Sequence, residues 1–155
     1  MGSPRRETVI EESIRIDAGV RDVWETFTDF ACWDKWCTAV GGLQAEGRAA
    51  PGSGPALRFS IRPFSLPITI TPAIDEMVPL EKIAWRGRKY GVAARHEFAF
   101  AEDGGGTLLT SREVFSGPAM RFLSFLVPLG RLHGITVRLL EDIKRESERL
   151  AEEGS

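Results

Sequence analysis

His96 and Glu113 are the side chains best suited to acid–base chemistry, and both lie in segments rich in apolar and aromatic residues. If the turn at 102–107 joins two antiparallel strands in the register that gathers those residues on one face, His96 lies opposite Glu113. In an apolar cavity this pair could pass a proton to or from an enolisable carbonyl. A register shifted by one residue would place Arg112 opposite His96 and turn Glu113 outward. Alternatively, the pair only satisfies its own hydrogen bonds between two strands.

Four further polar residues are candidates for a site. His133 falls in a helical pattern beside a glycine, so it either faces the mouth of a cavity or lies in solvent. Tyr90 precedes a strand and either gates a pocket or is a plain turn residue. Arg62 and Arg86 could supply a cation to an enzyme, but strand alternation puts both on the face opposite the apolar residues.

Other chemistries lack their residues. Cys32 and Cys37 have no second cysteine pair and no nearby histidine, so we expect no metal site and two reduced thiols, with a disulfide open if the turn brings them together. No nucleophile elbow of the Gly-x-Ser-x-Gly type occurs, and the glycines at 104–106 belong to a hairpin rather than to a phosphate-binding loop. We therefore expect no cofactor.

Composition narrows the class of protein. The net charge of -2 gives no broad attraction to nucleic acid, and no apolar run is long enough to span a bilayer. The first residues lack the apolar core of a signal peptide, which predicts a cytoplasmic protein. The length of 155 residues fits one domain over 1–155, with its core at about 8–150, as a monomer or a homodimer.

Hydrophobic periodicity predicts the elements that must position these residues. Alternation of apolar and polar residues predicts strands over 8–16, 43–46, 57–62, 68–75, 82–88, 95–101 and 107–115. Helical spacing predicts one short helix after 19, a second over 30–36, and one long helix from 118 or 119 to the charged end at 141–153. We expect Pro72 to make its strand an edge or a bulge, and Pro128 to bend the long helix. The charged end is interpreted as a solvated helix face.

This order of elements predicts an α+β domain. A curved antiparallel sheet of about six or seven strands must be covered on its inner face by the single C-terminal helix, with two short helices after the first strand. A strongly curled sheet that holds one helix tends to leave a cleft where a ligand can bind.

Several sequence blocks occur in an order typical of one superfamily. The blocks are Ile16 to Trp24 (IDAGVRDVW), Asp29-Phe30 with Trp33 and Trp36, Trp85-Arg86-Gly87, His96-Glu97-Phe98, Gly106-Thr107, and Glu113 to Gly117 (EVFSG). In this order they resemble the polyketide cyclase/dehydrase branch of the START-like (SRPBCC) superfamily over nearly the whole chain. The likeness specifies a superfamily and not an activity. Gly19 stands where the family pattern usually has proline, which loosens the start of the first helix.

The resemblance implies a helix-grip fold with a central apolar cavity. Its predicted lining is Phe59, Ile70, Trp85, His96, Phe98, Leu109, Glu113, Phe122, Phe125, Leu129, Leu132 and Thr136. The first functional hypothesis is binding of a hydrophobic small molecule, lipid-like or aromatic and polyketide-like. The second is a cyclase/aromatase or dehydratase that uses His96 and Glu113, with His133 as a further candidate. The third is a module with a filled core that acts through a protein partner.

Overall fold

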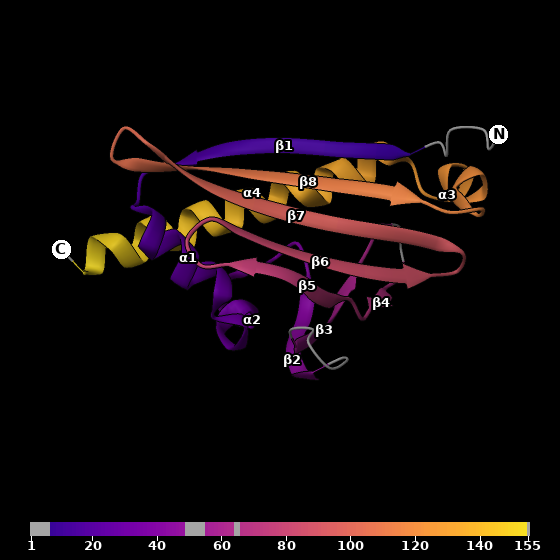
Figure 1. Cartoon of the computed structure of the whole chain (residues 1–155), viewed down its shortest axis with the longest axis horizontal. Coiled ribbons are helices and arrows are strands. Elements are labelled where there is room, and N and C mark those ends of the chain that lie inside the picture. Colours follow the sequence, from indigo (N-terminus) through magenta and orange to yellow (C-terminus); the bar gives the residue numbers. More distant parts are fainter. Residues whose placement is uncertain (1–6, 49–54, 64–65, 155) are drawn as a thin grey trace.

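A curled antiparallel sheet dominates the computed structural model, which describes residues 7–48, 55–63 and 66–154 (Figure 1). Within these residues seven strands follow the order β1-β8-β7-β6-β5-β3-β2, and a short β4 pairs with β3. The strands are β1 (Thr8–Ile16), β2 (Gly41–Arg48), β3 (Pro55–Ile61), β4 (Ile68–Ile70), β5 (Ala73–Val78), β6 (Lys82–Lys89), β7 (Val92–Asp103) and β8 (Gly106–Ser116).

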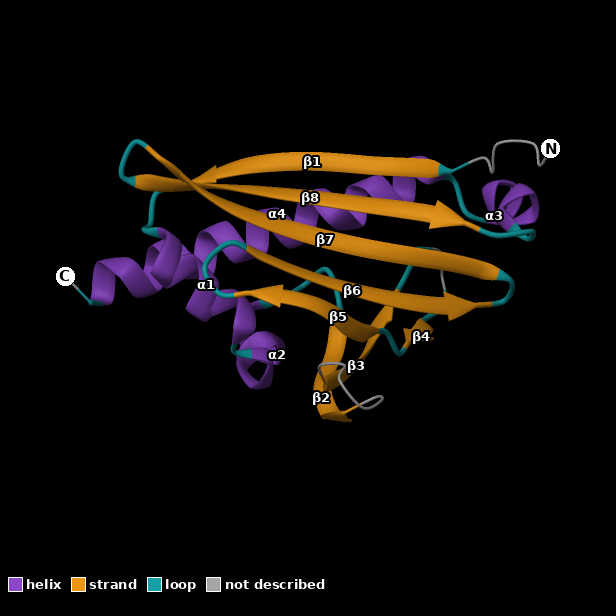
Figure 2. Cartoon of the chain, in the orientation of Figure 1, coloured by secondary structure: helices purple, strands orange, loops and turns teal. Residues whose placement is uncertain are grey.

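One long helix lies across the sheet, as Figure 2 shows for α4 behind β1, β8 and β7. The helices are α1 (Val20–Thr28), η1 (Phe30–Cys32), α2 (Trp33–Trp36), α3 (Met120–Leu126) and α4 (Leu129–Glu153). The short α3 stands at one end of the sheet, and the C-terminus lies beyond the other (Figure 1). This arrangement is a helix-grip fold, which confirms the predicted class.

Aromatic rings fill the core at the α1 end of the sheet. Phe27 is fully buried, and its ring centroid lies 4.7 Å from that of Phe98 and 5.3 Å from that of Trp33. Trp33 and Trp36 share a helical face, as their spacing predicts, with ring centroids 5.2 Å apart. A second, smaller cluster of Ile10, Phe115 and Met120 lies near α3.

Two carboxylates fix the C-terminal half of α4. Asp142 is 2% exposed and accepts hydrogen bonds from the backbone N–H groups of Thr38 (2.8 Å) and Ala39 (3.1 Å). Glu148 accepts from the backbone N–H of Asp17 (2.8 Å), and its ion pair with Lys144 holds the pKa of its carboxyl below the usual value. The interpretation of 141–153 as a solvated face is therefore wrong for Asp142, because this buried carboxylate supplies the acceptors for the backbone N–H groups at 38–39.

Two prolines interrupt elements that the sequence pattern joins. The helix expected from 118 or 119 is two helices, because Pro128 cannot donate to Ser124 and disfavours helical backbone at the residue before it. Pro128 itself adopts φ −58° and ψ 132° and caps α4. The strand expected over 68–75 is likewise broken at Pro72, whose carbonyl accepts from Leu57 N–H at 2.8 Å.

Candidate functional site

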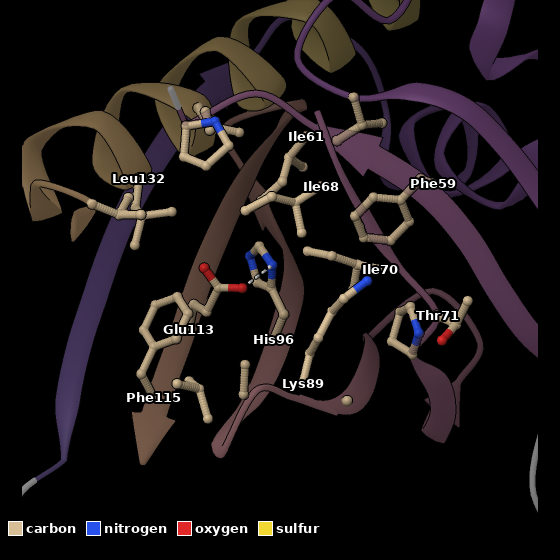
Figure 3. A pocket seen from close by; sticks show the side chains of 18 of the residues that line it. Phe59, Ile61, Ile68, Ile70, Thr71, Lys89, His96, Glu113, Phe115 and Leu132 are labelled. Atoms are coloured by element: carbon tan, nitrogen blue, oxygen red, sulfur yellow. Dashed lines mark ion pairs between the residues drawn. The ribbon is translucent and has the colours of Figure 1, made fainter. Parts of the chain in front are cut away.

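A cavity of about 720 Å³ lies between the inner face of the sheet and α4 (Figure 3). It separates the aromatic core under α1 from the small cluster near α3, and it takes lining residues from both. Its size falls within the range of roughly 300–1,000 Å³ that small-molecule pockets occupy. Large aromatic side chains fill the space between sheet and helix at the α1 end, whereas part of this space is left open toward α3.

A buried histidine and a carboxylate form the polar part of the wall. His96 lies opposite Glu113 across β7 and β8, which confirms the register predicted from the apolar pattern. Nδ1 of His96 lies 3.2 Å from Oε2 of Glu113, and Nε2 lies 2.6 Å from Oγ of Ser111. The imidazole also stacks on Phe98 with centroids 4.2 Å apart, so these three contacts fix its orientation in the cavity wall.

The contacts of the imidazole define the proton positions. An ionised carboxylate only accepts hydrogen bonds, so in the neutral ring the proton sits on Nδ1 and Nε2 accepts from the Ser111 hydroxyl. The side chain of Glu113 is 19% exposed, compared with 9% for His96. Figure 3 shows its carboxylate between His96 and Leu132 of α4. Glu113 is therefore the member of the pair that a bound molecule can reach.

Small residues and cations line the wall between this pair and the β6–β7 turn. Gly87 and Ala94 are paired across β6 and β7 and both line the cavity. Because neither has a large side chain, little of the cavity is filled at this position. Arg88 and Lys89 also belong to the lining, and Nζ of Lys89 donates to the carbonyl of Thr69. A bound molecule near the turn would therefore meet positive charge.

Exposed apolar side chains mark the mouth of the cavity. Leu66, Tyr90 and Phe122 all belong to the lining, yet they are 66%, 80% and 72% exposed. They come from the β3–β4 connection, the β6–β7 turn and α3. The cavity therefore opens at the α3 end of the molecule.

Eight of the predicted lining residues surround this cavity: Phe59, Ile70, Trp85, His96, Glu113, Phe122, Leu132 and Thr136. The other four do not. Phe98 and Leu109 face the same side of the sheet but are fully buried in the aromatic core. Phe125 is 91% exposed, because α3 ends before Pro128 and does not continue the buried stripe of α4. Leu129, the first residue of α4, is 40% exposed.

The remaining polar candidates lie apart from the His96–Glu113 pair. His133 is at the surface, with Nε2 2.6 Å from Oε1 of Glu12, and it is not part of the lining. Arg86 points to the outer face, where its Nε lies 3.1 Å from Oδ2 of Asp75, and Arg62 is exposed. Tyr90 adopts φ 53° in the β6–β7 turn and lines the mouth.

Sequence reasoning missed lining residues whose signal was present. Gly87 and Lys89 continue the inward alternation of Trp85, but the strand was expected to end at residue 88. Val92 and Ala94 likewise precede His96 with a period of two. Longer strand boundaries would have found Lys89, Val92 and Ala94, whereas Gly87 already lay within the expected strand.

The thiols and possible metal ligands add no second centre. Cys32 and Cys37 are free; a hydrogen bond with Asp29 raises the pKa of the first, and burial raises that of the second. Within the described ranges, no three His, Cys, Asp or Glu residues come together as metal ligands. Of the helices that the structure describes, none combines the length and apolar character that crossing a membrane requires.

The sequence as a whole matches one family. The family model, described as polyketide cyclase / dehydrase and lipid transport, covers residues 7–151. The chain belongs to this family. The START-like superfamily inferred from the sequence blocks is thereby confirmed. No curated protein matches the sequence significantly.

Solved structures share the fold of this polyketide cyclase family member at low sequence identity. The Zhui aromatase/cyclase from Streptomyces sp. R1128 has a TM-score of 0.75 at 18% identity, covering 93% of this chain and 95% of that chain. A START superfamily protein from Mycobacterium smegmatis has a TM-score of 0.68 at 15% identity, with 95% and 99% covered. Norcoclaurine synthase from Thalictrum flavum has a TM-score of 0.71 at 12% identity, with 94% and 97% covered. These likenesses concern the fold alone.

Proposed function

We propose that this protein binds an apolar small molecule, lipid-like or aromatic, in the cavity between the sheet and α4. The observation that carries the proposal is an open cavity of about 720 Å³ between the sheet and α4. In most proteins, core side chains fill this kind of space. Because protein interiors are close-packed, an unfilled space of this size is typical of a site that binds a small molecule. A module with a filled core that acts only through a protein partner is therefore disfavoured.

The lining also suggests what the occupant carries. Most of the wall is aliphatic or aromatic, which favours an apolar body. Glu113, together with Thr136 of α4, offers hydrogen-bonding groups inside, and Lys89 offers a positive charge near the turn. We infer an elongated molecule with an apolar body, an inner hydroxyl or carbonyl, and a polar or anionic end near the mouth.

Native mass spectrometry of the purified protein, followed by thermal-shift screening with fatty acids, sterols and aromatic polyketides, tests this proposal. We expect a retained apolar compound, or a Tm increase of about 5–10 °C at a ligand concentration near 100 times Kd. The increase reflects binding to the folded state alone. Absence of both effects across all three ligand classes would overturn the proposal.

A second candidate function is cyclisation or dehydration of a polyketide-like compound. Its specific support is the fixed His96–Glu113 pair, whose carboxylate reaches the cavity. Glu113 would take the proton next to a carbonyl, and the resulting enolate carbon would add to a second carbonyl carbon of the same molecule. The π bond of that second carbonyl breaks, and its oxygen takes the proton back from Glu113 to become a hydroxyl. In a dehydration this hydroxyl would then leave as water, together with a proton from the neighbouring carbon. His96 would hold the carboxylate in position. The structurally similar Zhui protein is an aromatase/cyclase.

Substitution of Glu113 by Gln separates the two candidates. If the pair is catalytic, Glu113→Gln lowers turnover of a bound linear β-polyketone about a hundredfold or more and leaves its Kd within about threefold. The matched control is Glu97→Gln, which changes an outer-face carboxylate of β7 that pairs with Lys82. Equal turnover in Glu113→Gln and wild type would remove the enzymatic candidate.

A further inference from the structure

Large apolar side chains gather outside the cavity at the α3 end. Among the large apolar side chains that the structure describes, the four most exposed are Phe125 (91%), Tyr90 (80%), Phe122 (72%) and Leu66 (66%). The next two, Val9 and Met77, are each 45% exposed. We call the four residues Leu66, Tyr90, Phe122 and Phe125 the apolar rim. In Figure 1, α3, the β6–β7 turn and β4 lie at the same end, away from the C-terminus. Singly scattered apolar residues are ordinary on a surface, but a group of the most exposed ones indicates a contact surface.

The chain around the apolar rim carries positive charge without carboxylates. No Asp or Glu occurs between Glu46 and Asp75, between Glu81 and Glu97, or between Glu113 and Glu141. The three segments that form the rim fall inside these three stretches. They carry Arg88, Lys89, Arg121 and Arg131 close in sequence to the rim residues.

Nearby carboxylates are engaged elsewhere or lie on another strand. On β1, Glu12 contacts His133 at 2.6 Å and Glu11 lies 3.5 Å from Arg112, while Glu7 is exposed just before the start of the strand. Asp75 and Glu76 pair on the outer face of the sheet, both with Arg95 and the latter also with Lys82. The net charge of the whole chain is -2, so the cationic character of the rim segments is a local asymmetry.

We propose that the apolar rim docks the protein on an anionic lipid bilayer. Aromatic and aliphatic side chains enter the interface between headgroups and acyl chains, while neighbouring Lys and Arg contact the anionic headgroups. The rim comes from three separate segments, and three of its four residues line the cavity mouth. A bilayer needs no complementary shape, whereas a peptide would need one continuous groove. Docked in this way, the cavity mouth faces the membrane, and an apolar molecule can pass between them without crossing water. The proposal concerns the outer surface and holds whichever compound occupies the cavity.

Vesicle flotation of the full chain tests the docking. We expect binding to phosphatidylcholine vesicles that contain about 30 mol% phosphatidylglycerol, weak binding to pure phosphatidylcholine, and release when NaCl is raised from about 50 to about 500 mM. Phe125→Asp should weaken binding at least about tenfold, because it removes an inserted ring and adds a repelled charge. Phe125 does not line the cavity, so ligand binding and Tm should stay unchanged in this variant. The matched control is Leu150→Asp, an exposed leucine near the C-terminal end of α4.

Each alternative result overturns the proposal in a distinct way. No flotation with anionic vesicles, while ligands still bind, removes the docking and leaves the cavity function intact. Equal loss of flotation in Phe125→Asp and Leu150→Asp would mean that the apolar rim is not the specific membrane-binding surface. A dimer in light scattering that Phe125→Asp dissociates, without vesicle binding, assigns the rim to a second copy of the chain.

Discussion

Replacing Asp142 by Ala is expected to lower the free energy of unfolding by about 3 kcal/mol, and Tm by roughly 6–12 °C. The carboxylate is buried and accepts from two backbone N–H groups, those of Thr38 and Ala39, and from the Thr38 hydroxyl at 2.9 Å. Removing it leaves the buried N–H of Ala39 and the partly buried donors of Thr38 without their acceptor, and an unpaired buried donor costs about 1–3 kcal/mol. The loss also frees Arg145, whose Nη2 lies 2.6 Å from Oδ1 of Asp142.

Thermal and urea unfolding of matched variants check this expectation. Glu141→Ala changes the exposed neighbour on α4 and should stay within about 0.5 kcal/mol of wild type. Asp142→Asn keeps one acceptor oxygen and should fall between the two. A loss below about 1 kcal/mol in Asp142→Ala would mean that water satisfies the donors at 38–39.

The hydrophobic period was sufficient to predict the architecture. Alternation in β1, β6, β7 and β8 and the helical stripe of α4 identified the elements that hold the sheet and its covering helix. The register of β7 and β8 also followed, because a shift by one residue would have put Phe98 and Leu109 on opposite faces of the sheet, with one of these two buried residues turned to solvent. That register brings His96 to Glu113, so the central pair of the candidate site could be predicted from the sequence.

Local backbone chemistry and long-range contacts account for what the sequence pattern missed. Pro128 ends one helix and begins another, although the apolar spacing continues through it, because periodicity does not report a missing N–H donor. Asp142 has the charge of a surface residue, and its partners at 38–39 lie far away in the sequence. The unfilled volume depends on small residues such as Gly87 and Ala94, because alternation shows which face a residue is on but not that the space in front of it is left unfilled.

Filling the cavity from Ala94 is expected to weaken ligand binding while the fold is retained. Ala94 lies between the β6–β7 turn and His96 on the inner face of β7, and its cross-strand neighbour is Gly87. In Ala94→Trp, an indole would enter space that no protein atom occupies, so it would bury apolar surface without overpacking. A ligand that used this space would have to give up contacts or displace the ring, at a cost of about 1–3 kcal/mol, which weakens Kd about fivefold to 150-fold.

The measurement is titration with a fluorescent fatty acid, cis-parinaric acid, alongside thermal unfolding. Tm of Ala94→Trp should equal or exceed that of wild type, because cavity filling commonly stabilises a folded protein. The matched control, Ala101→Trp, places the same side chain at an exposed position near the far end of β7 and should leave Kd unchanged. Unchanged Kd in a folded Ala94→Trp would place the bound fatty acid outside the cavity, since a molecule between the β6–β7 turn and Glu113 must pass this position.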